Sequence, residues 1–326
     1  MKHQLQLILL AFLVFSCNKN SPEDMPLPSP ETDVWQRDTN NPVLRDLIPA
    51  ENYEVASDSH VFYDEDGNLR MVYTGDYQGR AAIKLANGAS INQWSVNKAV
   101  VFEENNDGLD LFKETPFYRK SSTGKHQIFY IGYDDETTYQ SQIYLAEADR
   151  VDGIYTQRKL PVVPRGILAG KDVYLITSPS IVAHQGLLYM VFIGWNNAPD
   201  LVSEIWIIGA VSSDDGYTWS DFQLVDTPIG AEGQITKTPD GGFVAVRTAE
   251  FDDDEAIFYA TANHPFGPWK QDDTPILTKD GSILEKDEII AAQVTFNPQT
   301  QEEYLFYTGA NQQIGWWIML AQRARL

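Results

Sequence analysis

Short runs of aliphatic and aromatic residues, separated by turn residues, recur along the chain from residue 35 onward, and none has helical periodicity. The clearest runs have the character of the second strand of a hairpin, and most of them end at glycine: residues 71–75, 128–132, 190–194, 244–248 and 305–309. Their starts lie 57, 62, 54 and 61 residues apart. A repeat of this length made only of strands predicts a propeller of four-stranded blades.

The remainder of each block supports the same prediction. A third apolar strand follows every second strand, at residues 81–86, 142–146, 205–210, 256–260 and 317–321. In four blocks a turn then leads to an aromatic residue: Trp94, Tyr155, Trp219 and Trp269. The turn at residues 212–219 fits the Asp-box pattern, in which Asp and Gly form a tight turn and the Trp packs between strands.

Five such blocks fill residues 35–326 with little left over. We therefore expect an all-β fold, a five-bladed β-propeller of four-stranded antiparallel blades, over this range. The alternative is a β-sandwich followed by a small β domain, but that arrangement does not explain five comparable spacings.

The charge balance narrows the choice of partners. Lys and Arg total 24 against 46 Asp and Glu, which gives a net charge of −22 and a pI near 4.4. Such a field repels nucleic acid and anionic lipid, so we expect no binding driven by phosphate contacts. Uncharged sugars are not repelled, and we expect a monomer with a carbohydrate partner.

The N-terminus indicates the compartment. A short basic start precedes an apolar segment at residues 5–15, which is too short to span a bilayer as an anchor. It leads into Ser16 and Cys17 in a pattern that resembles a bacterial lipobox, and Cys17 is the only cysteine. We predict a signal peptide at residues 1–16, a lipid on Cys17, and a flexible tether over residues 17–34 that holds the protein on the periplasmic or cell-surface side of a membrane. The alternative is an ordinary cleaved signal peptide.

The first strand of each blade lines the channel of a propeller, so residues at its entry converge on one pocket. Acidic residues occur at three of the five entries: Asp58, Glu114 and Glu232. Glycoside hydrolysis needs two carboxyl groups, a protonated donor for the leaving oxygen and an ionised base or nucleophile. Glu232 also precedes Gly233, which lets a ligand approach the backbone closely.

Several of these segments resemble family 43 glycoside hydrolases and their relatives in families 32, 62, 68 and 117. Trp35, residues 41–44, and Asp58 ahead of residues 61–67 are similar to their first blade. Glu232 and Gly233 resemble their Glu-Gly-Pro motif in the fourth blade, and residues 264–269 resemble the outer turn that follows it. The resemblance implies that Asp58 is the base or nucleophile and Glu232 the general acid.

The chain departs from the family 43 pattern in three places. The third-blade entry has Ser178 where family members usually carry an Asp that tunes the acid. The second-blade entry lacks the usual Asp, and Glu114 stands one residue out of register. The histidine common in the fifth blade has no counterpart near Gln293. An atypical branch is therefore expected, and loss of activity is an open alternative.

Five further residues are candidates for substrate contact. Glu114 could supply a third carboxylate, and the Ser178 hydroxyl could bind a sugar hydroxyl. His60 follows Asp58 by two residues, so in a regular strand both face the same side. Trp195 could stack on a sugar ring, and Arg247 could pair with a channel carboxylate. The structural alternatives are a rim carboxylate, the start of a strand, a core histidine and packing.

We expect no cofactor. The acidic run at residues 252–255 resembles a Ca²⁺ site but is also typical of a solvated loop between strands.

The leading functional hypothesis is a glycosidase acting on plant or algal glycans, releasing arabinofuranosyl, xylosyl or fructosyl units. A non-catalytic glycan-binding propeller is the alternative. A sialidase would need an arginine cluster and a nucleophilic tyrosine that the sequence does not place, and a phosphorolytic relative of family 130 remains open.

Overall fold

The computed structural model describes residues 34–48, 53–100, 102, 111–134, 138–196, 204–230, 232–252 and 254–323, and for residues 97–100 the backbone alone. The predicted signal peptide, Cys17 and nearly all of the tether lie outside the described residues. Within the described ranges, no helix has the length and apolar character needed to cross a membrane.

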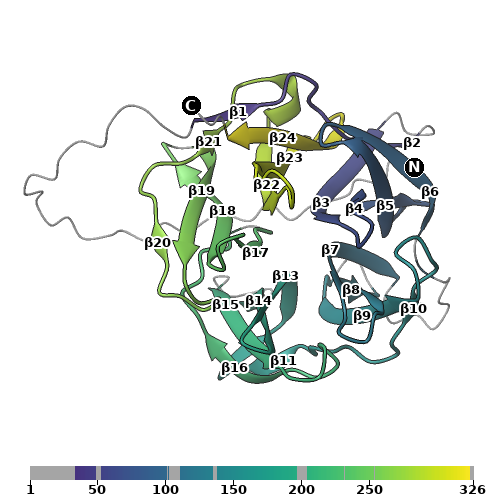
Figure 1. Cartoon of the computed structure of the whole chain (residues 1–326), viewed down its shortest axis with the longest axis vertical. Helices are drawn as coiled ribbons and strands as arrows, with labels where there is room; N and C mark the ends of the chain where they lie inside the picture. Colours follow the sequence, from purple (N-terminus) through teal and green to yellow (C-terminus); the bar gives the residue numbers. More distant parts are fainter. Residues whose placement is uncertain are drawn as a thin grey trace, which may run out of the picture.

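The chain forms a ring of five blades, which confirms the predicted propeller (Figure 1); a short parallel pairing of β24 with β3 joins blades five and one into one sheet. Blade one contains β3 (Tyr53–Tyr63), β4 (Leu69–Tyr77), β5 (Arg80–Ser90) and β6 (Gln93–Val100). Blade two contains β7 (Phe112–Lys120), β8 (His126–Tyr133), β9 (Gln142–Ala148) and β10 (Thr156–Gln157). Blade three contains β13 (Leu175–His184), β14 (Leu187–Asn196), β15 (Glu204–Ser212) and β16 (Ser220–Leu224). Blade four contains β17 (Ile235–Lys237), β18 (Phe243–Phe251), β19 (Asp254–Ala262) and β20 (Lys270–Gln271).

The fifth blade joins the two ends of the described chain. Its inner three strands are β22 (Glu288–Phe296), β23 (Glu303–Asn311) and β24 (Gly315–Arg323). The fourth strand is β1 (Trp35–Arg37), which pairs antiparallel with β24. The ring is therefore closed by hydrogen bonds between strands that are far apart in sequence.

Short elements occupy the connections between and beside the blades. They are β2 (Leu47–Ile48), the hairpin of β11 (Gly166–Leu168) and β12 (Lys171–Val173), β21 (Leu277–Thr278) and the 3-10 helix η1 (Ile283–Glu285).

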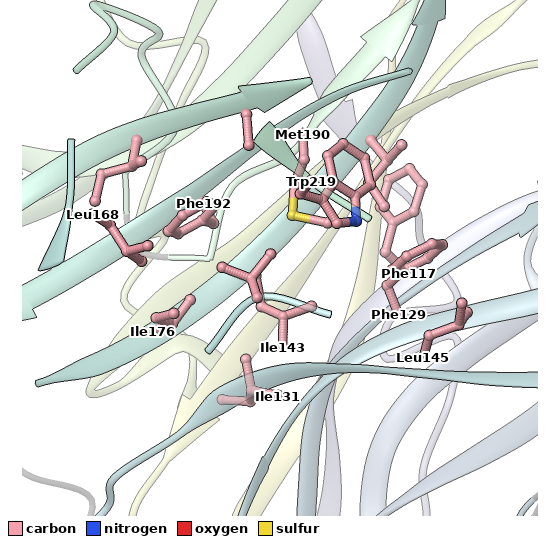
Figure 2. Packing of buried hydrophobic residues seen from close by; sticks show 14 of the residues in the cluster. Phe117, Phe129, Ile131, Ile143, Leu145, Leu168, Ile176, Met190, Phe192 and Trp219 are labelled. Carbon is pink, nitrogen blue, oxygen red and sulfur yellow. The ribbon is translucent and has the colours of Figure 1, made fainter. Parts of the chain in front are cut away.

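Apolar side chains fill the wedges between neighbouring blades. Between blades two and three, β8, β9, β13 and β14 contribute a cluster that includes Phe129, Ile143 and Met190 (Figure 2). Trp219 of the predicted Asp-box lies in this wedge at the edge of the Phe129 ring, and its indole N–H donates to the Gly216 carbonyl at 3.0 Å. The Asp-box has the structural role that its sequence predicted.

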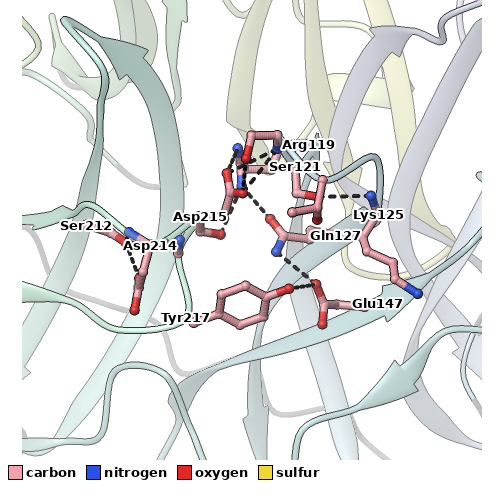
Figure 3. A network of polar contacts seen from close by, with 12 residues as sticks. Arg119, Ser121, Lys125, Gln127, Glu147, Ser212, Asp214, Asp215 and Tyr217 are labelled. Carbon is pink, nitrogen blue, oxygen red and sulfur yellow. Dashed lines mark hydrogen bonds and ion pairs between the residues drawn. The ribbon is translucent and has the colours of Figure 1, made fainter.

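A polar network on the outside of the same two blades connects them (Figure 3). Arg119 of β7 donates to the Asp215 carboxylate at 3.1 Å, and the backbone N–H of Ser122 donates to the same group at 3.2 Å. Tyr217 donates to Glu147 of β9 at 2.7 Å. Charged residues here are satisfied by partners in the neighbouring blade.

A buried ion pair fastens the closure of the ring. Arg37 of β1 donates from Nε and Nη2 to the two oxygens of Glu285 at 2.7 and 2.6 Å. Tyr307 of β23 donates its hydroxyl to the same carboxylate at 2.7 Å. Glu285 is fully buried, and the backbone N–H of Asp280 also donates to its Oε2 at 3.2 Å, so several donors compensate its charge.

Replacing Glu285 by Gln is expected to lower the free energy of unfolding by about 2–4 kcal/mol, because a buried guanidinium loses its counter-charge. Urea unfolding followed by tryptophan fluorescence measures the change. The matched control is Asp152→Asn, which breaks the exposed pair with Arg150 and should cost less than about 1 kcal/mol. Equal effects of the two substitutions would contradict the closure role of Glu285.

Candidate active site

Each inner strand enters the channel through a residue with a left-handed backbone. The five residues share φ between 47° and 57° and stand at equivalent positions of the five blades: Asp58, Thr115, Ser178, Glu232 and Ala291. In blades one, two, three and five the pairing with the second strand shifts register at this point, as in a β-bulge. Non-glycine residues in this conformation cost about 1–2 kcal/mol each, and such strain concentrates at functional sites.

Threonines of the preceding blade hold several of these bulges in place. The backbone N–H of Asp58 donates to Oγ1 of Thr308 in β23 at 3.2 Å, and that of Thr115 donates to Oγ1 of Thr74 in β4 at 3.1 Å. Thr248 of β18 donates to the carbonyl of Ile289 at 3.1 Å, next to the bulge of blade five. The threonine near the end of a repeated second strand therefore orients the site residue of the next blade.

The five positions carry two carboxyl groups, two hydroxyl groups and one methyl group. Around the ring, blade five lies between blades four and one (Figure 1). Ala291 therefore separates Glu232 from Asp58, and its small side chain leaves room for the two carboxyl groups to approach each other. The equivalent residue of blade two is Thr115, so Glu114 is one residue out of register, as the sequence indicated.

Asp58 and Glu232, the predicted catalytic pair, lie at the bulges on either side of Ala291, and their carboxyl groups interact electrostatically. Burial, and then the charge of Asp58, raise the pKa of Glu232 well above its ordinary value; the charges of Glu114 and Glu288 act in the same direction. A carboxyl group with a raised pKa keeps its proton to higher pH, so Glu232 is the member of the pair suited to donate a proton.

Two glycines seat the loop that carries Glu232 against β18. A Cβ atom on Gly233 would lie 2.0 Å from the carbonyl oxygen of Val246, and one on Gly230 would lie 2.1 Å from that of Thr248. No side chain fits at either position. Gly233 thus serves close packing of the loop on its own blade, which is a different use from the ligand approach expected from the sequence.

Glu114 reaches the same site from blade two, held by two tyrosines. Tyr133 of β8 donates to its Oε1 at 2.8 Å, and Tyr139 donates to its Oε2. The Tyr133 and Tyr139 rings pack with their centroids 4.4 Å apart. Glu114 and Tyr139 both interact electrostatically with Glu232, so this cluster faces the catalytic pair. Tyr133 and Tyr139 were not identified as site residues from the sequence. The one indication there is that Tyr133 ends the second strand of blade two and Tyr139 lies in the connection that follows it.

A second layer of side chains closes the channel beneath the bulge residues. Nδ1 of His60 and Oε1 of Gln234 are 2.8 Å apart, and the His60 ring packs on Phe117 at 4.1 Å. Gln293 accepts from the backbone N–H of Val61 at 2.6 Å. Burial lowers the pKa of His60 to about 4, so this histidine is neutral.

His60 does not lie beside Asp58 on one face of the strand, as the regular alternation of side chains predicted. The bulge at Asp58 inserts an extra residue, so the two side chains do not simply share one face of a regular strand. His60 instead borders a separate cavity of about 380 Å³ on the far side of this floor, together with Phe62, Phe117 and Gln293.

The remaining candidates lie around the mouth. Ser178 is buried at its bulge position, with its hydroxyl 3.3 Å from that of Thr177. Trp195 is half-buried and packs on the cluster between blades three and four. Arg247, which we expected to pair with a channel carboxylate, forms no ion pair in the described part of the chain; its guanidinium lies 5.0 Å from the Phe258 ring centroid. That expectation was wrong, because the side chain turns to the aromatic ring.

An aromatic wall that the sequence did not reveal stands beside Ala291. Trp316 of β24 packs with Ala291 and Ile290, and its indole N–H donates to the hydroxyl of Tyr53 at 3.1 Å. Trp316 is buried, whereas Tyr53 is half-buried, so this cluster supports the backbone at Ala291, the bulge position between Glu232 and Asp58.

No metal site accompanies these groups. Among the described residues, no three His, Cys, Asp or Glu side chains are arranged to hold an ion. In the acidic run, Asp253 lies outside the described residues, Asp254 pairs with Lys279, and Glu255 accepts from the backbone N–H of Ile289 at 2.9 Å.

Comparison with known proteins places this ring among the glycoside hydrolase propellers by fold. No protein-family model and no curated protein matches the chain. The structure of a thermostable family 43 glycoside hydrolase is 18% identical, with a TM-score of 0.62, and the match covers 83% of this chain and 89% of that one. The catalytic domain of a family 62 α-L-arabinofuranosidase from Coprinopsis cinerea is 10% identical, with a TM-score of 0.65 and coverage of 90% and 98%.

A third similar structure belongs to family 130, which is described as mannoside phosphorylases that include hydrolases of β-1,2-mannosidic linkages in Candida mannan. It is 14% identical, with a TM-score of 0.63 and coverage of 92% of this chain and 98% of that one. The fold of this chain is thus that of the five-bladed propellers to which family 43 and its relatives belong.

Proposed function

We propose that the protein is a glycoside hydrolase in which Glu232 donates a proton to the leaving oxygen and Asp58 acts as base or nucleophile. The observations that carry the proposal are the equivalent bulge positions of Asp58 and Glu232 in blades one and four and the raised pKa of Glu232, to which the charge of Asp58 contributes. A carboxyl group that keeps its proton beside a second carboxyl group fits the division of roles that glycosidic cleavage requires.

The cleavage step needs room for a sugar between the two groups. Hydrolysis places the two carboxyl groups about 5 Å apart in retaining enzymes and about 6.5–9.5 Å apart in inverting ones. Glu232 gives its proton to the departing oxygen, and Asp58 either attacks the anomeric carbon or removes a proton from the attacking water.

The substrate class follows from the shape and charge of the site together with the fold. The half-buried Tyr53 ring beside Trp316 suits an apolar sugar face, and the charges of Asp58, Glu114 and Glu288 disfavour an anionic leaving group close to Glu232. Likeness in fold to an α-L-arabinofuranosidase supports arabinofuranosyl, xylosyl or fructosyl units of plant or algal glycans as the first substrates to test.

A non-catalytic glycan-binding propeller is the second candidate. It is favoured by Ser178, which stands where family 43 members carry the Asp that tunes the acid. Glu114, held by its two tyrosines, supplies a third carboxylate from a different blade and is the reason that we rank hydrolysis first.

The lipid anchor forms part of the proposal. Cys17 and the tether would keep the propeller at the outside of a membrane, within reach of glycans. Mass spectrometry of the membrane fraction and globomycin treatment would test lipid attachment.

Glu232→Gln and Asp58→Asn are each expected to lower kcat/KM on the best arabinofuranosyl, xylosyl or fructosyl substrate by at least about 1,000-fold, because each removes one half of the proton transfer. Thermal unfolding at pH 7 should show an intact fold. For Glu232→Gln the melting temperature should not fall, since a neutral amide replaces a neutral acid. Full activity in both variants would refute the assignment, whereas glycan binding without turnover in the wild type would favour the second candidate.

The pH profile should report the environment of Glu232. Its raised pKa means that the proton donor is lost only as pH rises above the ordinary carboxyl range, so activity falls on the alkaline side. Glu114→Gln removes a negative charge that raises this pKa, and the alkaline limb of kcat/KM should move to lower pH by up to about one unit. Glu250→Gln, an exposed position on the β18–β19 hairpin, serves as control and should leave the limb in place. If the alkaline limb of kcat/KM stays in place in Glu114→Gln, the charge of Glu114 does not raise the pKa of Glu232.

A further inference from the structure

Arg247 is the cation nearest in the fold to the loop that carries Glu232. It lies in β18, and the backbones of Gly230 and Gly233 press directly on it: a Cβ on Gly230 would lie 3.0 Å from the Arg247 Cβ, and one on Gly233 would lie 3.3 Å from its Cα. Along β18, Arg247 shares a face with Ala245, which packs toward blade three. The guanidinium therefore projects between blades three and four, at the mouth of the channel.

This guanidinium has no carboxylate partner in the described chain. It lies 5.0 Å from the centroid of the Phe258 ring, and its Nε is enclosed without a hydrogen-bond acceptor among the described residues. Burial lowers the pKa of Arg247, in contrast to Arg37, whose pKa is raised through contacts with Glu285. An unpaired, half-buried charge is costly, and it is unexpected in a chain with 46 acidic and 24 basic residues.

The facing side of the same interface also offers a donor without an acceptor. Trp195 of β14 packs on the cluster that contains Ile229 and Ala245, and its indole N–H is buried and unpartnered. Ile229 belongs to that cluster, and Gly230, which follows it, packs on Arg247. Among the described residues, the Trp195 indole N–H and the Arg247 Nε are therefore buried donors without an acceptor on the two sides of this interface.

We infer that the gap between blades three and four binds an anionic substituent of the glycan, a uronate carboxylate or a sulfate ester, through Arg247. The inference rests on the proposed glycan site and adds the substrate class. Because the Arg247 side chain is half-buried while its Nε is enclosed, the terminal nitrogens are the part that solvent and ligand reach. A planar guanidinium holds a carboxylate or sulfate by paired hydrogen bonds.

The net charge of the protein, −22, repels an acidic glycan. Any preference for an acidic glycan must therefore come from a local contact. Loss of that one contact should therefore remove the preference and leave the binding of neutral glycans unchanged.

The experiment measures binding in the Glu232→Gln background, so that turnover does not interfere. Isothermal titration calorimetry compares oligogalacturonides and glucuronic-acid-bearing xylo-oligosaccharides with the same compounds after methyl esterification, which removes only the charge. Sulfated and desulfated galactan oligosaccharides distinguish the two sources of the anion. The acidic form should bind at least about 10-fold more tightly than its neutral counterpart in one of these pairs.

Adding Arg247→Gln should reduce the ratio of the two affinities to about one, and Arg247→Lys should keep part of the preference. Arg158→Gln is the matched control: it removes the same charge from an arginine that also lies 5.0 Å from an aromatic ring, that of Tyr217, on the outer side of the blades. The control should keep the full preference.

Each outcome decides a separate question. Binding of neutral but not acidic glycans, or an unchanged preference in both Arg247 variants, would overturn the anionic subsite and leave the hydrolase proposal intact. Preferential binding of acidic glycans without cleavage by the wild type would support the subsite and overturn the hydrolase. Failure to bind any glycan would overturn both. Binding of inorganic phosphate that depends on Arg247 and drives turnover would reassign the anion to the attacking group and overturn a sugar substituent.

Discussion

The left-handed bulge at the entry of each inner strand determines which side chains form the site. It turns one side chain per blade out of the regular alternation of the strand and toward the channel, and neighbouring blades hold it by hydrogen bonds such as that from the Asp58 N–H to Thr308. Because the same backbone geometry recurs five times, the chemistry of the pocket is decided by which residue occupies each position. The strain of about 1–2 kcal/mol at each bulge is tolerated because a whole blade supports it.

The occupants of the five positions divide the pocket into a reactive side and a recognition side. Asp58 and Glu232 meet over the small Ala291, whereas Thr115 and Ser178 leave hydroxyl groups on the opposite side. Glu114 adds a third carboxylate beside Thr115, held by the hydroxyl groups of Tyr133 and Tyr139. Concentrating like charges in a buried place is unfavourable, and the molecule accommodates it by keeping a proton on Glu232.

The charged residues that join the blades, unlike those of the pocket, have partners of opposite charge. Arg37 and Glu285 at the ring closure, and Arg119 and Asp215 between blades two and three, satisfy one another across elements that are distant in sequence. These contacts hold blades together and leave no group free for a ligand. Arg247 is the contrast, since within the part of the chain that the structure describes no acidic group pairs with it, although acidic residues are in large excess. The difference separates contacts that maintain the fold from groups that we assign to recognition.

The amino-acid sequence by itself determined the all-β class, the five blades and the Asp-box, because hydrophobic spacing and turn chemistry are local and repeat along the chain. It also placed Asp58 and Glu232 at channel entries, through their position before apolar strands and a resemblance to known motifs. Only the tertiary structure decided that His60 lies in the floor, that Tyr139 holds Glu114, and that Arg247 has no acidic partner among the described residues. A one-residue bulge shifts which side chains face the channel without changing the hydrophobic pattern, and contacts between blades depend on residues that come together only when the ring closes.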